Sequence, residues 1–281
     1  MLRDIERYLT CPHCRLGLAL DATGRALRCS GGHSFDIAKQ GYVSLLPGDA
    51  HTGTGDTAEM VAARADFLEA GHYRAIAEAL ATAAAATGAG SAVGGLVADL
   101  GTGTGYYLAR VLDALDGTAG AALDISKFAL RRAARAHPRA GAVACDAWRP
   151  LPLADACADL VLNVFAPRNG AEIRRVLRPG GSLLVASPTT RHLRELVGAL
   201  GLLVVDEEKE RRIDEKLGPW FTPGPRTEVE FELRLSRRDA AAVVGMGPNA
   251  WHTDPAAVAG ALAQLPEPVA VTGSVRIAEY R

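Results

Sequence analysis

From residue 96 onward, short apolar runs alternate with longer segments in which apolar residues recur at helical spacing. Apolar runs of about four to eight residues between turn residues predict buried strands. We place such strands at 96–100, 120–124, 142–145, 158–164, 182–187, 202–208 and 228–235. The amphipathic segments predict helices near 105–114, 126–136, 169–178 and 190–199. This alternation is typical of an α/β fold with a mostly parallel sheet, whose ligands bind beyond the carboxyl ends of the strands.

The chain before residue 96 has a different pattern. Residues 47–57 are rich in Gly, Asp and Thr and predict a linker. Helices are expected over 58–69 and from 71 to about 86. Further upstream, residues 18–27 predict two short strands around an Asp-Ala-Thr-Gly turn. We therefore expect three parts, which are a small domain at 1–46, linker and helices at 47–95, and a large domain at 96–281.

Composition narrows the class of protein. The chain has 281 residues, of which 48% are hydrophobic and 22% charged, as in soluble globular proteins. The formal net charge is −1, so any RNA contact must come from local patches. No apolar run approaches the roughly 20 residues of a membrane span, and the first residues lack an apolar signal region. Five cysteines in such a chain favour a reducing compartment, so we expect a cytoplasmic protein.

Metal-binding side chains fall in a C-x2-C-x14-C-x3-H pattern formed by Cys11, Cys14, Cys29 and His33. Two short knuckles separated by a hairpin-length segment can place four such ligands around Zn²⁺. Because all four are protein groups, the site would be closed and structural, and the metal would supply folding energy. The alternative is a redox pair with an unrelated Cys29, but redox chemistry needs no second knuckle. His13 competes with His33, but its position between two cysteines should point its ring away.

A glycine-rich turn follows the first strand of the large domain. After Asp99 come Gly101, Gly103 and Gly105, which let a ligand lie directly on the main chain. A dinucleotide fingerprint needs a glycine at position 106, which is Tyr106, and no Lys-Ser/Thr pair follows to make a P-loop. An ordinary βα loop is the alternative. An acid two residues before G-x-G-x-G resembles motif I of S-adenosylmethionine-dependent methyltransferases.

That resemblance gives roles to residues at the ends of three strands. Asp124 could accept both ribose hydroxyls of S-adenosylmethionine, cap the helix that begins at Ser126, or do both. Asp146 would accept the adenine amine, and Ala147 would donate its backbone N–H to the ring. Asp99 would lie near the methionine ammonium. The residues predicted to bind the cofactor are Asp99, Gly101, Thr102, Gly103, Gly105, Tyr106, Asp124, Ile125, Asp146, Ala147 and Asn163.

The segment from Asn163 to Pro167 ends the fourth strand. Related enzymes hold the base to be methylated there, beside the sulfonium. We therefore place Asn163 and Pro167 in the catalytic site, although a chain breaker after a buried strand is the alternative.

Local positive charge is the basis for predicting RNA contact. Lys127, Arg131 and Arg135 share one face of a predicted helix, and the first 46 residues are mildly basic. A solvated face is the alternative interpretation of such a run. The residues predicted to bind RNA are Arg7, Arg15, Arg28, Lys127, Arg131 and Arg135.

The residues around and after the metal ligands carry a second resemblance to a known family. The chain reads C-P-x-C and then C-x-x-x-H-x-F-D-x-A-x-x-G-Y-V-x-L-L up to Leu46. This is similar to the N-terminal zinc domain of the RlmA family of 23S rRNA guanine-N1 methyltransferases, including its macrolide (tylosin)-resistance branch. The resemblance covers most of the chain. It implies a class I S-adenosylmethionine-dependent methyltransferase, with a Rossmann-like seven-stranded sheet and a small N-terminal zinc-binding, RNA-recognition domain.

The same resemblance implies a substrate and partners. It points to N1 of one guanine in a 23S rRNA hairpin loop, to altered macrolide sensitivity, and to a homodimer. Guanine N1 is hidden in a duplex, so the target must be unpaired or flipped out. Two rivals remain. One is a small-molecule methyltransferase, which the near-neutral charge favours, and the other is a non-catalytic, zinc-dependent RNA-binding module.

Overall fold

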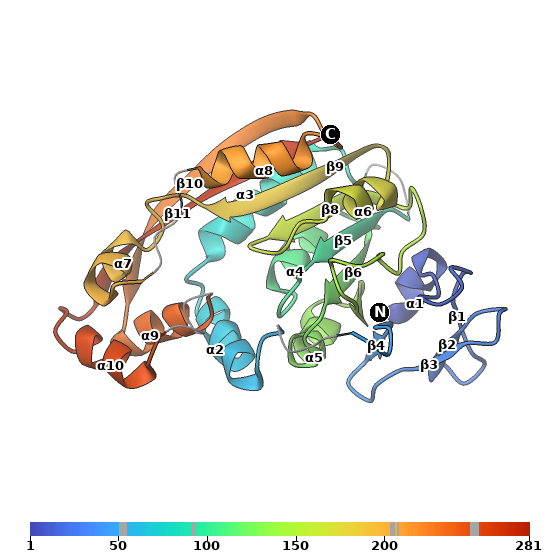
Figure 1. The fold of residues 1–281 in the computed structure, drawn as a ribbon, viewed down its shortest axis with the longest axis horizontal. Coiled ribbons are helices and arrows are strands. Elements are labelled where there is room, and N and C mark those ends of the chain that lie inside the picture. The colour runs from blue at the N-terminus through green and yellow to red at the C-terminus, as the bar shows by residue number, and fades with distance from the viewer. Residues whose placement is uncertain (51–54, 91–93, 203–205, 207, 248–252) are drawn as a thin grey trace.

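Eight strands form one sheet in the order β10-β11-β9-β8-β5-β6-β7-β4 in the computed structural model (Figure 1), which describes residues 1–50, 55–90, 94–202, 206, 208–247 and 253–281. The strands from β4 to β9 are parallel, and β11 is antiparallel to both β9 and β10. Their bounds are Tyr42–Ser44 (β4), Leu96–Leu100 (β5), Ala119–Asp124 (β6), Ala140–Ala144 (β7), Ala158–Val164 (β8), Leu177–Pro188 (β9), Pro223–Leu235 (β10) and Val269–Tyr280 (β11). The predicted α/β class is confirmed, and β4 adds an eighth strand to the seven that were expected.

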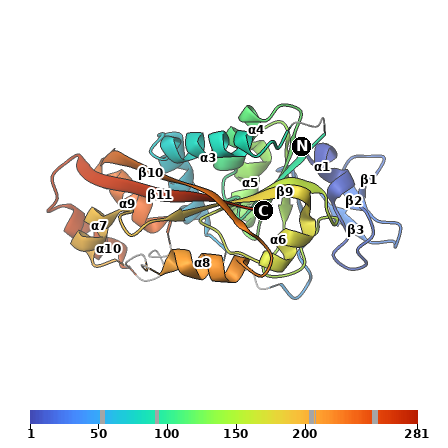
Figure 2. The ribbon, with the colours of Figure 1, turned by 90° about the horizontal axis from the view of Figure 1, so that it is seen from above.

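Each face of the sheet carries its own hydrophobic core. Along β5, Val97 packs into one core, and Leu96 and Ala98 pack into the other. Figure 2 shows α3 and α4 over one face and α6 and α8 over the other. A sheet covered on both faces requires nearly continuous apolar strands, which explains the runs found in the sequence. None of the described helices has both the length and the apolar character that a membrane crossing needs.

Six of the described helices fall where the sequence predicts them, whereas the first helix and the last three were not predicted. Their bounds are Leu2–Ile5 (α1), Ala58–Glu69 (α2), Arg74–Ala86 (α3), Tyr106–Ala114 (α4), Lys127–Ala136 (α5), Gly170–Val176 (α6), Arg194–Leu200 (α7), Lys209–Leu217 (α8), Arg237–Gly245 (α9) and Pro255–Leu262 (α10). The helix expected at 190–199 begins only at Arg194. Leu193 before it has a left-handed backbone with φ of 57°, which is incompatible with a continuous helix.

One predicted strand lies mostly outside the described residues, and two strands of the large sheet were not predicted. Within the predicted strand 202–208, residues 203–205 and 207 lie outside the described residues, and Asp206 belongs to no strand. The two strands that were not predicted are β4, which is only three residues long, and β11, whose apolar pattern is interrupted by Gly273 and by charged residues. Pairing on both sides compensates for that interruption. Phe231 of β10 lies opposite Gly273, where an added Cβ would be 2.5 Å from the phenyl ring.

The first 46 residues, which we call the zinc-binding segment, are joined to the edge of the large sheet. Within the segment, β1 (Ala19–Leu20), β2 (Ala26–Arg28) and β3 (Ser34–Asp36) form an antiparallel sheet. The next strand, β4, pairs with β7, about a hundred residues later in the chain. The α1 helix packs on the same strand, because an added Cβ at Gly141 would lie 2.6 Å from the Ile5 side chain. The segment therefore extends the sheet.

Candidate functional site

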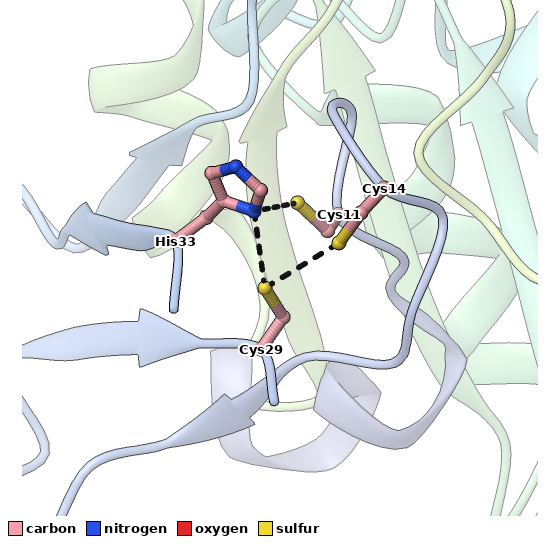
Figure 3. Close-up of side chains that lie close together, drawn as sticks. All are labelled: Cys11, Cys14, Cys29 and His33. Carbon is pink, nitrogen blue, oxygen red and sulfur yellow. Dashed lines mark hydrogen bonds between the residues drawn. The ribbon is translucent and has the colours of Figure 1, made fainter. Parts of the chain in front are cut away.

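Three cysteines and one histidine converge in the zinc-binding segment (Figure 3). The Nδ1 atom of His33 is 3.5 Å from Cys11 Sγ and 3.4 Å from Cys29 Sγ, and the Sγ atoms of Cys14 and Cys29 are 3.6 Å apart. A tetrahedral Zn²⁺ with Zn–S of about 2.3 Å and Zn–N of about 2.0 Å requires S···S of about 3.8 Å and S···N of about 3.6 Å. The observed spacing therefore fits zinc.

The local backbone brings the two knuckles together. An added Cβ at Gly31 would lie 3.1 Å from Cys14 Sγ and 3.6 Å from Cys29 Sγ, so a larger residue there would crowd the Cys14 sulfur. Burial opposes ionisation of the Cys29 thiol, but hydrogen bonds from His33 outweigh it and lower the pKa of Cys29 to about 6. A thiolate is the form that binds metal. The ring of His13 lies outside the cluster, stacked on Phe35 at 5.9 Å, as its position in the sequence predicts.

The glycine turn after β5 has the backbone that its sequence requires. Gly101, Gly103 and Gly105 have φ values of 70°, 56° and 81°, all in the left-handed region. An added Cβ at Gly101 would lie 2.6 Å from the Cβ of Ala166, and one at Gly105 would lie 2.8 Å from that of Ala136. The turn therefore packs tightly against the loop after β8 and against α5.

Asp99 lies under this turn and is almost completely buried. Its Oδ2 accepts a hydrogen bond from the Thr102 hydroxyl at 2.7 Å, while its Oδ1 has no partner among the described residues. Burial, opposed by Thr102 and reinforced by the charge of Asp124, raises the pKa of Asp99 to about 7. A buried oxygen without a donor suits a positively charged ligand group such as an ammonium.

Asp124 ends β6 and is fixed by two backbone groups. Its Oδ2 accepts from Gly103 N–H and its Oδ1 from Ser126 N–H, both at 2.8 Å. Burial raises the pKa of Asp124, and these bonds oppose the rise. The predicted helix cap is made by Ser126 instead, whose hydroxyl accepts from Ala129 N–H at 3.4 Å. Asp124 thus ties the end of β6 to the glycine turn.

Other predicted site residues occupy the same edge of the sheet. Ile125 follows Asp124, and the half-buried Tyr106 opens α4 directly after the turn. Asp146 follows β7, and its Oδ1 accepts from the backbone N–H of Trp148 at 2.9 Å, across Ala147. Asp146 is therefore held in place by its own loop.

Asn163 and Pro167 are joined to each other. The Asn163 side chain is fully buried and its Nδ2 donates to the Pro167 carbonyl at 2.6 Å. This bond closes the loop after β8 over the carboxyl end of the strand. The Oδ1 of Asn163 has no partner among the described residues. Their catalytic role stays a prediction, and their visible role is to shape the loop.

The residues predicted to bind RNA divide into two groups. Arg7 donates to the Gly94 carbonyl at 2.8 Å, and Arg15 donates to the Leu151 carbonyl at 2.9 Å, so both are tied to the protein itself. Arg28 is exposed, and its Nε lies 3.9 Å from an Asp21 oxygen. On α5 the side chains of Lys127 and Arg131 lie over the Phe128 ring, and Arg135 is exposed. None of these α5 cations forms an ion pair within the described residues.

A group of aromatic rings around Phe165, the first residue after β8, was not predicted from the sequence. Phe165 is 41% exposed and contacts Tyr73, Tyr107 and His192, with ring centroids 6.2 to 6.4 Å apart. These residues come from four separate segments, so only the folded chain brings them together. The one local signal was the R-x-x-F-L-x-x-G-H-Y stretch that ends at Tyr73, which predicted either a pocket wall or a packed helix.

Together these features define a class I S-adenosylmethionine-dependent methyltransferase with a structural zinc domain at its N-terminus. The strands β5 to β9 form a parallel sheet, a glycine turn lies at the end of β5, and acids lie at or just after the carboxyl ends of β5, β6 and β7. The donor set at the turn fits a cofactor with an ammonium, a ribose and an adenine, and the cluster of three cysteines and a histidine fits zinc.

Comparison with known proteins identifies the family. The profile described as "RlmA, N-terminal" matches residues 9–52, and one described as "Methyltransferase domain" matches residues 97–181. The chain is 55% identical to a Micromonospora griseorubida protein provisionally described as a 23S rRNA (guanine-N(1)-)-methyltransferase, over 99% of this chain and 98% of that one. It is 50% identical to the 23S rRNA (guanine(748)-N(1))-methyltransferase of Streptomyces fradiae, over 98% and 97%. The chain therefore belongs to the RlmA-type family of 23S rRNA (guanine-N1)-methyltransferases.

Proposed function

We propose that the protein transfers a methyl group from S-adenosylmethionine to N1 of a guanine in a hairpin loop of 23S rRNA, and thereby alters macrolide sensitivity. The observation that carries this proposal is the joining of the zinc-binding segment to the methyltransferase sheet through β4 and β7. A small-molecule enzyme has no need of such an attachment. The relatives that share both parts over nearly their whole length support the same substrate class.

Several of the predicted cofactor residues then have a defined task. The cofactor supplies an electrophilic methyl group on a sulfonium, so the protein has chiefly to bind and orient. Asp124, fixed by Gly103 and Ser126, presents its carboxylate to the ribose hydroxyls. The unpartnered oxygen of Asp99 takes the methionine ammonium. Asp146 and Ala147 hold the adenine, and the loop closed by Asn163 and Pro167 shapes the cavity for the base.

The RNA surface would combine the zinc-binding segment with α5. The two are neighbours, because an added Cβ at Gly41 would lie 3.6 Å from the Cβ of Ala134 on α5. Lys127, Arg131 and Arg135 on that helix would contact RNA phosphates. A cytoplasmic location and a homodimer belong to the same proposal, and sedimentation velocity of the zinc-loaded protein tests the dimer.

Labelled S-adenosylmethionine and unmodified 23S rRNA test the reaction. We expect label in the RNA and a single reverse-transcription stop in one hairpin loop, because N1 methylation blocks the Watson–Crick edge. Asp124→Ala should abolish labelling, and Asp116→Ala, an exposed acid just before β6, should not. Label without a stop would mean that another atom is methylated. No label in 23S rRNA or its assembly intermediates would support a small-molecule substrate instead.

A further inference from the structure

The residue Phe165 has a conformation that packing alone does not require. Its backbone is left-handed, with φ of 54°, and its side chain is 41% exposed. Bulky residues rarely adopt this conformation, and the exceptions concentrate at ligand sites. Phe165 also lies directly after β8, at the edge of a parallel sheet where ligands bind.

A buried network supports the Phe165 ring from behind. The ring of His192 lies 6.2 Å from it at an interplanar angle of 24°. The Nδ1 of His192 accepts from Ser274 N–H at 3.1 Å, so its Nε2 carries the hydrogen and donates to the Tyr73 hydroxyl, also at 3.1 Å. Burial and the charge of Lys209 lower the pKa of His192 to about 4, so the ring is neutral. The network packs against the Phe165 ring and holds it in place, and the side chain remains 41% exposed.

Two cations form no ion pair within the described residues, and their charges act on this network, that of Lys209 on His192 and that of Arg168 on Lys209. The Nε of Arg168 is buried and has no hydrogen-bond partner among the described residues. Lys209 forms no ion pair within them, and burial and the charge of Arg168 lower its pKa. The charge of Asp206 opposes the fall in the Lys209 pKa without forming an ion pair. Burying cations is costly, and an anionic ligand would offset that cost further.

Lys209 also lines a cavity. It measures about 320 Å³ and lies beyond the end of β9, next to Thr189 and Thr190. Its other charges are mostly paired among themselves. Glu210 pairs with Arg276, and Glu228 pairs with both Arg276 and Arg191. Asp206 pairs with Arg212, so Lys209 is the cation of this lining that forms no ion pair within the described residues.

The loop that carries Phe165 also rests on the cofactor turn. The next residue, Ala166, fills the space where Gly101 lacks a Cβ. Tyr107, in the first turn of α4, lies 6.4 Å from the Phe165 ring. A flat ligand on Phe165 would thus lie next to the cofactor site.

We propose that Phe165 is the stacking platform for the guanine to be methylated, and that Arg168 and Lys209 bind a backbone phosphate of that flipped nucleotide. This inference rests on the proposed function, because it places the RNA substrate of the same reaction. Stacking on an aromatic ring together with cations on the backbone is how proteins hold unpaired nucleotides. His192 and Tyr73 are positioning residues, which act through Phe165.

Paired substitutions test the platform. Loss of one base-stacking contact corresponds to roughly a tenfold to hundredfold drop, so Phe165→Leu should lower kcat/KM for a 23S rRNA hairpin by that factor. Phe165→Tyr keeps the ring and should stay within about threefold. Cofactor affinity by calorimetry should be unchanged in both. Phe165→Gly suits the left-handed backbone and removes the ring, so it should fold and still lose activity. Equal kcat/KM for the Leu, Gly and wild-type proteins would overturn the platform.

Salt dependence tests the phosphate contact. Lys209→Gln should lower the slope of log affinity against log salt by about one for the hairpin, and Lys216→Gln, at the exposed end of the same helix, should not change it. The same slope for both variants would overturn the phosphate contact. Binding measured by fluorescence anisotropy separates the two proposals. RNA binding weakened by Phe165→Leu, with no methylation by the wild type, would refute the proposed reaction and leave Phe165 as a residue that stacks on an RNA base.

Discussion

Ionisation of Asp99 should control cofactor affinity between pH 5.5 and 7. Burial raises its pKa to about 7, and its Oδ1 has no partner. A cationic methionine ammonium next to that oxygen would favour the ionised form. If the cofactor binds only the ionised form, the competent fraction is about 0.5 at pH 7 and about 0.03 at pH 5.5. Affinity should therefore fall roughly fifteenfold over this range.

Titration calorimetry at pH 5.5, 6.2 and 7 measures this directly, below the titration of the cofactor's own amino group at about pH 8. Asp99→Asn should bind weakly and without this pH dependence. In the protein without cofactor, the contribution of Asp99 to folding stability changes with pH in the opposite direction. Because the folded pKa lies above the unfolded value of about 3.9, the contribution of Asp99 to stability is greatest below pH 4 and is lost as pH rises to 7. Constant affinity in the wild type, or the same pH dependence in Asp99→Asn, would refute the reasoning.

Three further perturbations follow from the geometry. Cys29→Ser, or a strong chelator, should abolish hydrogen-exchange protection of residues 1–46; protection that survives both would exclude a structural metal. Gly105→Ala should cost about 1–3 kcal/mol in denaturant unfolding and weaken cofactor binding, because its Cβ would clash with α5. Gly117 has a similar φ and nothing near an added Cβ, so Gly117→Ala measures the cost of the left-handed backbone without a clash. The double substitution Lys127→Gln and Arg135→Gln should reduce the salt slope of RNA binding by about two, and an unchanged slope would remove α5 from the RNA surface.

Features set by local chemistry could be predicted from the sequence. The spacing of four metal ligands identified the cluster that the structure assembles, because a knuckle fixes its own geometry. Asp99 and Asp124 were placed at strand ends, since each follows a buried apolar run. Features set by distant contacts were missed. Nothing local to β11 shows that two other strands enclose it. The ring group around Phe165 depends on His192, and the sequence gives no sign that the two meet.

The short strand β4 also determines how the sheet ends. Without it, β7 would be an edge strand of small apolar residues from Ala140 to Ala144, with an unpaired row of backbone donors and acceptors that invites other chains to add. A partner only three residues long blunts that edge. The strand β4 belongs to the zinc-binding segment, whose fold depends on the metal. Loss of zinc would therefore uncover the edge of β7, to which strands of other chains could add. Metal starvation should thus appear first as self-association, before the methyltransferase sheet itself unfolds.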